Sequence, residues 1–152
     1  MKGSFPVLRK TECFRTDFLL WFPGMKAGRQ WCVSVSEREQ DRWSRDLVSV
    51  FPGYEFYEKH GLGVLLLQGE EILSGASSYT VYNGGIEIEI DTREDCRRRG
   101  FAYICGAKLI LECLKRGLYP SWDAQNKWSV ALAEKLGYHF DHAYQAFEVG
   151  PL

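Results

Sequence analysis

The segment IEIEIDTREDCRRRGFAYICGAKLILECL, residues 86–114, decides the fold of this chain. It opens with isoleucines that alternate strictly with glutamates, a pattern typical of a strand with one buried face. Three consecutive arginines and Gly100 follow, and apolar residues then recur at helical spacing until Gly117, a natural C-terminal stop. The segment therefore predicts a strand, a cationic turn and a helix in direct succession.

Further elements on both sides of this segment predict a mixed α/β domain. Strands are expected at 31–36, 62–68, 72–81, 86–90 and 119–124, with a final strand or hairpin at 138–149; helices are expected at 37–51, 101–117 and 127–136, and 52–61 is a turn-rich connector with some helical character. Residues 1–29 show no steady period, so no element is assigned there. We take them as an N-terminal extension of uncertain role before a domain at 30–152.

Composition narrows the functions that fit. The 152 residues are 45% hydrophobic, enough apolar mass for one globular domain with a real core. Lys+Arg (19) and Asp+Glu (20) leave a formal net charge of -1, so overall charge gives no support for nucleic-acid or membrane-surface binding. No apolar run approaches the ~20 residues that span a bilayer, and the N-terminus lacks the apolar core of a signal peptide.

The cysteines and histidines argue against a metal site. The chain has 5 cysteines, an odd number without CxxC spacing, which suits a reducing cytoplasm better than a disulfide framework or a zinc site. Cys105 and Cys113 fall within the apolar helical pattern and are interpreted as small buried hydrophobes. His60, His139 and His142 have no acidic or Cys partner at ligand spacing, so no metal is expected.

The arginine turn predicts a binding site for an anion such as a phosphate. First-turn N–H groups of a helix lack intrahelical partners, and the helix dipole is positive at that end. Gly100 allows close approach of a ligand to the backbone, and Arg97 to Arg99 offer planar, multidentate donors. The simpler interpretation, a solvated basic turn, stays open on these residues alone.

Two motifs identify a family resemblance. RRRGFA (97–102) resembles the (Q/R)xxGx(G/A) signature of the GNAT superfamily of acyl-CoA-dependent N-acyltransferases, and WDAQNKWSVALAEKLGY (122–138) resembles its second signature, an Asn opening a helix that ends in "EKLGF". With EIEIDTREDCRRRGFA, the text looks most like the acetyltransferase subgroup that includes zwittermicin-resistance enzymes, over about residues 43–148. The resemblance implies a mixed, mostly antiparallel central sheet with flanking helices, and acetyl-CoA as the acetyl donor.

The resemblance also implies how the cofactor is held. The strand backbone at Ile90 to Thr92 should run along the pantetheine arm, and N–H groups at the helix start should hold the pyrophosphate, with Arg97 and Arg99 as auxiliary cations. Asn126 should lie near the pantetheine or the thioester, although it serves equally as a plain helix N-cap. The implied cofactor-binding residues are Ile90, Thr92, Arg97, Arg98, Arg99, Gly100, Phe101, Ala102 and Asn126.

Strand alternation provides candidates for the catalytic base. Glu87, Glu89 and Asp91 share the face opposite the isoleucines, where a carboxylate beside the cofactor can accept the proton of an attacking amine. Glu87 resembles the base position of several family members, with Glu89 as the alternative, and a backbone N–H near Thr92 is the expected oxyanion donor. A merely solvated strand face is the competing interpretation.

Ala133 departs from the family pattern. Many members carry at this position a Tyr whose hydroxyl protonates the departing thiolate, and alanine has no such group. A thiol with an ordinary pKa of ~8.5 is a tolerable leaving group without an acid. Tyr138, Tyr144 and Ser129 are the candidates to replace the missing hydroxyl.

The sequence thus favours transfer of an acetyl group from acetyl-CoA to a primary amine of a small molecule or a protein, in the cytoplasm and without nucleic acid, membrane or metal. A homodimer stays open. The alternatives are a non-catalytic acyl-CoA-binding or regulatory module, which Ala133 would suit, and a nucleic-acid binder, which the balanced charge disfavours.

Overall fold

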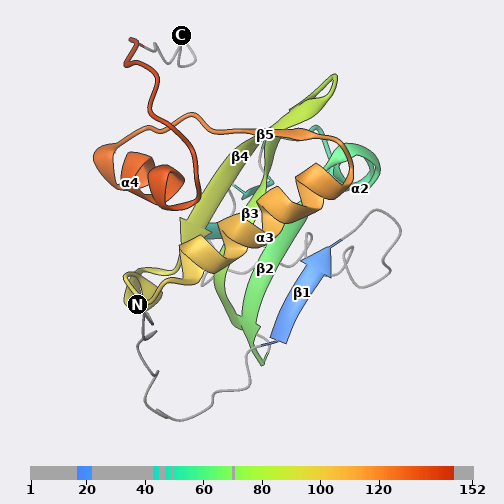
Figure 1. Cartoon of the computed structure of the whole chain (residues 1–152). Coiled ribbons are helices and arrows are strands. Elements are labelled where there is room, and N and C mark those ends of the chain that lie inside the picture. The colour runs from blue at the N-terminus through green and yellow to red at the C-terminus, as the bar shows by residue number, and fades with distance from the viewer. Residues whose placement is uncertain (1–16, 22–42, 45–46, 49, 70, 146–152) are drawn as a thin grey trace, which may run out of the picture.

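The computed structural model describes residues 17–21, 43–44, 47–48, 50–69 and 71–145. These residues form a five-stranded sheet with helices against it (Figure 1). The elements, in chain order, are β1 (Asp17–Trp21), α2 (Tyr54–His60), β2 (Gly63–Gln68), β3 (Glu71–Tyr82), β4 (Gly85–Thr92), the 3-10 turn η2 (Glu94–Cys96), α3 (Phe101–Lys115), β5 (Tyr119–Ser121) and α4 (Lys127–Lys135).

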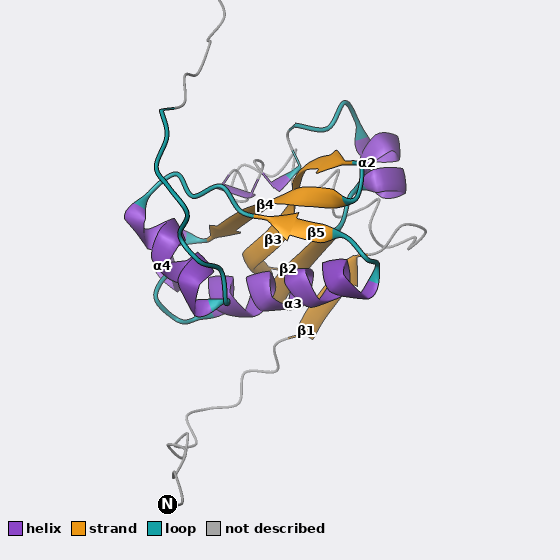
Figure 2. Cartoon of the chain, turned by 45° about the horizontal axis from the view of Figure 1, so that its top comes forward, coloured by secondary structure: helices purple, strands orange, loops and turns teal. Residues whose placement is uncertain are grey.

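The sheet has the order β1-β2-β3-β4-β5 and is antiparallel except for its last pair, β4 and β5. Short turns join β2, β3 and β4, whereas the parallel pair needs a crossover connection, which α3 supplies. Figure 2 shows α3 running across one face of the sheet. This arrangement confirms the predicted mixed, mostly antiparallel sheet with flanking helices.

The isoleucines of β4 form the sheet's contribution to the core. Ile86 and Ile88 are buried and pack in one cluster with Cys105, Leu109 and Cys113 of α3. Both cysteines are free thiols, and burial raises the pKa of each to about 11. Both cysteines therefore act as small hydrophobes. Because side chains alternate along a strand, the glutamates of β4 lie on the opposite face of the sheet.

The expected C-terminal strand at 138–149 is wrong for residues 138–145, which form no strand; the remainder lies outside the described residues. The strand expected at 119–124 likewise ends early, at Ser121. Pro120 has no N–H to donate to a ladder, and its carbonyl oxygen accepts a hydrogen bond from the Tyr138 hydroxyl (2.6 Å). A side chain therefore takes the acceptor that a further strand would need.

The N-terminal part differs from the expected elements. β1 lies within residues 1–29, where no element is assigned; it pairs antiparallel with β2 at the sheet edge, and its sequence DFLLW lacks the alternation that marks a half-buried strand. The strand expected at 31–36 is outside the described residues. Within the helix expected at 37–51, the described residues include short 3-10 turns, and α2 follows in the turn-rich connector.

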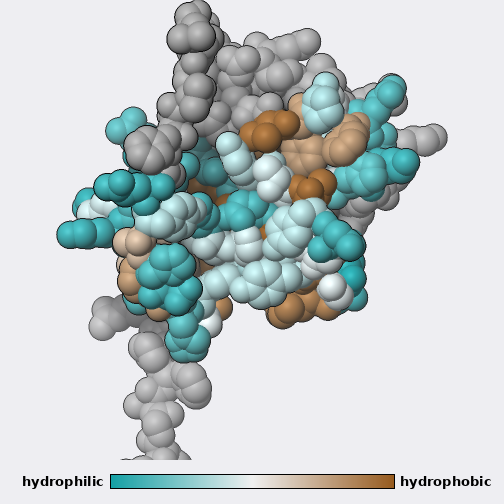
Figure 3. Space-filling model, turned by 90° about the horizontal axis from the view of Figure 1, so that it is seen from above, coloured by the Kyte–Doolittle hydropathy of each residue, from teal (hydrophilic) through white to brown (hydrophobic). Residues whose placement is uncertain are grey.

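The described helices and surface show neither a membrane span nor a large apolar patch on the face seen from above. None of the described helices combines the length and apolarity needed to cross a bilayer. In the view from above (Figure 3), the hydrophobic atoms lie in small, separate groups among polar ones. Scattered apolar groups of this kind are normal for a protein surface.

The packing of α3 predicts the cost of two matched leucine truncations. Leu109 has no exposed surface, so Leu109→Ala should leave a cavity and lower the free energy of unfolding by about 2–5 kcal/mol. Leu114 lies on the same helix but is 60% exposed, so its truncation leaves no cavity. Leu114→Ala should therefore change the free energy of unfolding by about 0.5 kcal/mol or less. Urea denaturation measures both; equal losses would contradict the described face of α3.

Glu112 is a buried carboxylate held by two lysines of α3 and by Arg116, the C-cap residue of that helix. Its carboxylate oxygens lie 3.4 Å from Lys108 Nζ, 3.0 Å from Lys115 Nζ and 2.9 Å from Arg116 Nη1. The hydrogen bond from Lys115, followed by that from Arg116, lowers the pKa of Glu112 to about 2, from an ordinary value of 4.5. Because the folded state holds the charged form more strongly than the unfolded state does, this carboxylate stabilises the fold above pH 4.5.

We expect that stabilisation to disappear as the pH falls from 4.5 toward 2. Glu112→Gln should therefore be less stable than the wild type at neutral pH, with the gap in Tm closing in that acidic window. Thermal unfolding at a series of pH values measures the gap, and Glu134→Gln, at an exposed position of α4, is the control. A gap that stays constant down to pH 2 would show that the ion cluster does not set the acid dependence.

Candidate functional site

The last two strands of the sheet separate from one another. β5 pairs with β4 only at Gly85↔Tyr119, Ile86↔Pro120 and Glu87↔Ser121. β4 then continues to Thr92, while the chain after Ser121 turns away toward α4 (Figure 1). Residues 88–92, which β5 does not pair, are called the open edge of β4 below.

Backbone groups of Ile90 and Thr92 face this open edge. The Arg93 N–H donates to the Leu73 carbonyl oxygen of β3 (3.0 Å), and backbone groups alternate in direction along a strand. Those of Asp91 therefore also face β3, and those of Ile90 and Thr92 face the other way. The structure thus orients the two residues as a ligand lying along the edge would require.

Both backbone groups of Thr92 already have partners. Its N–H donates to Oδ1 of Asp91 (2.7 Å), and its carbonyl oxygen accepts from Nε of Arg97 (3.3 Å). The Thr92 N–H, the expected oxyanion donor, is therefore bonded to a carboxylate of its own strand. It can donate to a ligand only if its hydrogen bond to Asp91 breaks.

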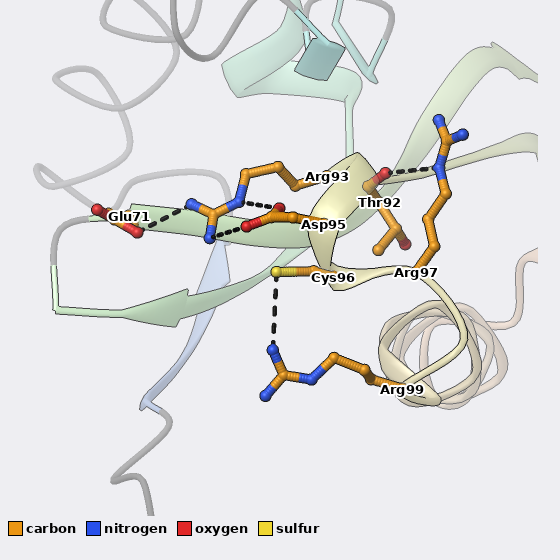
Figure 4. Close-up of polar contacts among 7 residues, drawn as sticks. All are labelled: Glu71, Thr92, Arg93, Asp95, Cys96, Arg97 and Arg99. Atoms are coloured by element: carbon orange, nitrogen blue, oxygen red, sulfur yellow. Dashed lines mark hydrogen bonds and ion pairs between the residues drawn. The ribbon is translucent and has the colours of Figure 1, made fainter.

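Arg93, which the sequence analysis did not single out, closes the turn. Its guanidinium donates to Asp95 (2.7 Å) and to Glu71 of β3 (2.9 Å), as Figure 4 shows. These two hydrogen bonds raise the pKa of Arg93 above its ordinary value. Its charge is thereby matched within the protein, and Arg93 has a structural role.

The arginines of the signature do not converge on one point. Arg97 reaches back to Thr92 and so lies beside the open edge, whereas the Arg99 guanidinium lies 4.8 Å from the Phe101 ring centroid and 3.9 Å from Cys96 Sγ. Figure 4 shows the Arg97 and Arg99 side chains pointing in different directions. Arg97, Arg98 and Arg99 are all exposed, and the hydrogen bond to Thr92 places Arg97 at the edge.

The start of α3 has the geometry of an anion site. Gly100 has φ 83°, a left-handed conformation that favours glycine, and a Cβ there would meet no atom within 4 Å. Ile104 N–H bonds back to the Gly100 carbonyl oxygen (3.2 Å), so the N–H groups of Phe101, Ala102 and Tyr103 precede the helical ladder. Among the described residues none of these three donates to another protein group outside the helix.

Glu87 and Glu89 are partly buried on the sheet face opposite α3. The extra residue of a β-bulge lies in β3, between Ser78 and Thr80, so the alternation of β4 is intact. Oε2 of Glu87 accepts a hydrogen bond from Ser121, while Oε1 is buried and has no hydrogen-bond partner among the described residues. Glu87 is therefore enclosed at the point where the strands part, which a freely solvated strand face would not require.

Asn126 acts as the N-cap of α4. Its Oδ1 accepts from the backbone N–H groups of Trp128 and Ser129, both at 3.0 Å. The structure thus confirms Asn126 as a helix N-cap. A contact of Asn126 with the cofactor stays a prediction.

Two of the three hydroxyls that could replace the missing tyrosine as proton donor already donate hydrogen bonds to other groups. Tyr138 donates to the Pro120 carbonyl oxygen, and burial raises its pKa; Tyr144 donates to Asp123, and this hydrogen bond raises its pKa. Both shifts weaken the phenol as an acid. Ser129 accepts from Trp122 Nε1 (2.9 Å) beside the buried Ala133. No group of three or more His, Cys, Asp or Glu in the described chain could hold a metal ion.

Known proteins resemble this chain in sequence. The sequence model of the GNAT acetyltransferase family matches residues 33–147. The uncharacterized N-acetyltransferase YdfB of Bacillus subtilis (strain 168) is 32% identical over 96 residues, which are 62% of this chain and 37% of that protein.

Solved structures resemble the fold. A GCN5-related N-acetyltransferase-like protein from Streptococcus suis 89/1591 has 47% identity and a TM-score of 0.75, over 85% of this chain and 48% of that one. AAC(6')-Iy, in complex with the bisubstrate analog CoA-S-monomethyl-acetylneamine, has 13% identity and a TM-score of 0.57, over 90% and 99%. The second likeness concerns the fold alone.

The chain spans less than half of the length of the curated relative and of the Streptococcus suis protein. The stretch that matches the family model nevertheless contains the open edge, the arginine turn and α4. With more than half of its residues in that match, the chain belongs to the GNAT acetyltransferase family.

Proposed function

We propose that this chain binds acetyl-CoA along the open edge of β4 and transfers its acetyl group to a primary amine. The observation that carries the proposal is the parting of β4 and β5 immediately after Glu87, beside a helix whose start at Gly100 faces open space. The family match and the CoA-containing analog bound to AAC(6')-Iy support the choice of donor.

The residues present fit such a donor. Ile90 would bind the pantetheine arm through its backbone groups, and the Thr92 N–H would join it by exchanging the Asp91 carboxylate for the ligand. The N–H groups that begin α3 would bind the pyrophosphate. Arg97 is the best-placed auxiliary cation, because it is exposed and already held at the edge by Thr92. Arg98 and Arg99 would add long-range attraction for the phosphates.

In the proposed reaction, the amine nitrogen attacks the thioester carbonyl carbon, the C–S bond breaks, and the amine proton goes to Glu87. Oε1 of Glu87 suits this role because it is the carboxylate oxygen without a partner, and since it is buried, a bridging water would carry the proton to it. Ala133 offers no hydroxyl to the departing sulfur, so the thiolate would leave unassisted, as the ordinary pKa of a thiol of ~8.5 permits. Glu89 is the second candidate base.

A small-molecule amine is the acceptor we favour. Glu87, Glu89 and Asp91 line one face of β4 and would attract a cationic acceptor, and the analog bound to AAC(6')-Iy joins CoA to acetylneamine. A protein amine is the other acceptor class. The finer resemblance to zwittermicin-resistance-type enzymes belongs to this same question and stays a prediction.

We further propose that residues 30–152 are the acetyltransferase unit, to which the preceding segment adds β1 as an edge strand. The free thiols of Cys96, Cys105 and Cys113 suit work in the reducing cytoplasm. A non-catalytic acyl-CoA-binding module is the second candidate function, and Ala133 is the residue that favours it. Binding without turnover would identify it.

Acetyl-CoA should raise the Tm of the chain, since a ligand that binds only the folded state stabilises it by ~2.7 kcal/mol at 100-fold excess over Kd. Gly100→Val should abolish the shift, because its side chain fills the space in front of the helix. Gly117→Val is the matched control: Gly117 also has positive φ (68°) and open space around its Cβ position, but it lies at the far end of α3. Thermal denaturation measures all three proteins.

Both glycine variants should lose similar intrinsic stability, and only Gly117→Val should keep the ligand shift. Arg97→Ala should reduce the shift more than Arg99→Ala does, because Arg97 lies at the open edge. An unchanged wild-type melting curve at millimolar acetyl-CoA would refute the proposed donor.

Glu87→Gln should lower kcat by ~10²–10⁴-fold, because the amide keeps the shape of the side chain and removes its basicity. The Tm shift with acetyl-CoA should persist. Thiol release from acetyl-CoA in the presence of a panel of primary amines, including sisomicin and spermidine, measures turnover. Glu89→Gln is the control on the same face; a larger loss there would move the base to Glu89, and wild-type rates in both variants would exclude these carboxylates.

A further inference from the structure

The two carboxylate oxygens of Glu87 have different environments. Oε2 accepts a hydrogen bond from the Ser121 hydroxyl, whereas Oε1 is buried and has no partner among the described residues. A buried carboxylate oxygen without a donor is costly, and in a native protein such an atom usually meets a ligand or water. The unpartnered oxygen is therefore the one left to accept a proton, and because it is buried the proton would reach it through a bridging water.

Ser121 occupies the last pairing position before the strands separate. It is the final residue of β5 and lies opposite Glu87, which comes 34 positions earlier in the chain. The hydrogen bond thus joins β4 to β5 at the base of the open edge.

The neighbours of Ser121 hold it in place. Pro120 has a fixed φ and is buried, and its carbonyl oxygen accepts the Tyr138 hydroxyl at 2.6 Å. On the other side, Trp122 donates to Ser129 of α4 at 2.9 Å and packs against the Tyr138 ring at a centroid distance of 5.5 Å. Because both neighbours are anchored, the backbone of Ser121 is held in place beside Glu87.

We propose that Ser121 is a positioning residue for Glu87. Its hydroxyl holds Oε2, so that the carboxylate plane is fixed and Oε1 is directed at the water that carries the amine proton. The proton of the amine reaches Oε1 through that water, and Ser121 keeps its own proton throughout. This inference rests on the proposed function, in which Glu87 is the base.

Ser121→Ala should lower kcat by about 10- to 100-fold, since a catalytic group displaced by about 1 Å can lose that much. The Tm shift with acetyl-CoA should be unchanged, because Ser121 does not contact the phosphate site. Ser121→Thr keeps a hydroxyl on the same carbon and should recover most of the rate. The measurements are thiol release with the fastest acceptor of the amine panel and thermal denaturation.

A double-mutant cycle separates positioning from general stability. Adding Ser121→Ala to Glu87→Gln should change kcat by less than about twofold, because no basic oxygen is left to orient. Ser78→Ala is the control for loss of a buried hydroxyl: Ser78 accepts the Leu62 N–H at 3.0 Å, and its variant should lose stability while keeping kcat. Equal costs of Ser121→Ala in both backgrounds would overturn the inference.

A crystal structure of Ser121→Ala tests the same claim without turnover. The Glu87 carboxylate should adopt a different or mixed orientation; an unchanged single conformer would overturn the inference even if no acceptor were found. A wild-type protein that acetylates no amine on the panel would instead count against the proposed function. An active wild type with a fully active Ser121→Ala would leave that function standing and remove Ser121 from it.

Discussion

The brevity of the parallel pairing between β4 and β5 is the constraint on which the rest of the site depends. Three residue pairs hold the strands together, and the pairing stops at Ser121. A parallel pair requires a crossover, and here the crossover runs from the end of β4 through the arginine turn at 93–100 into α3. One connection therefore creates both the unpaired strand edge and the helix start beside it, and a ligand that needs both finds them adjacent.

The arginines of this region have different roles because they have different partners. Arg93 is neutralised by Glu71 and Asp95, so it holds the turn together. Arg97, only a few residues later, is exposed and anchored at the open edge through Thr92. A chain with a formal net charge of -1 can thus present local cation to an anionic ligand without a general affinity for polyanions.

The site could be predicted from the sequence where its parts are local. The alternation of β4, the glycine at the start of α3 and the Asn126 cap each depend on neighbours within a few positions, and the structure contains all three. No sequence pattern predicted the contact between Ser121 and Glu87, because it depends on the register between two strands far apart in the chain. The directions of the arginine side chains could not be predicted for a similar reason, because their tertiary partners set them.

The sequence by itself determined the family, the strands β2 to β4 and the helices α3 and α4, because periodicity, caps and turn glycines act over a few residues. Tertiary structure alone decided that β1 joins the sheet, that β5 stops at Ser121 and that residues 138–145 form no strand. Strand pairing requires a partner edge with free acceptors. Tyr138 occupies the Pro120 carbonyl, a contact that no local pattern specifies.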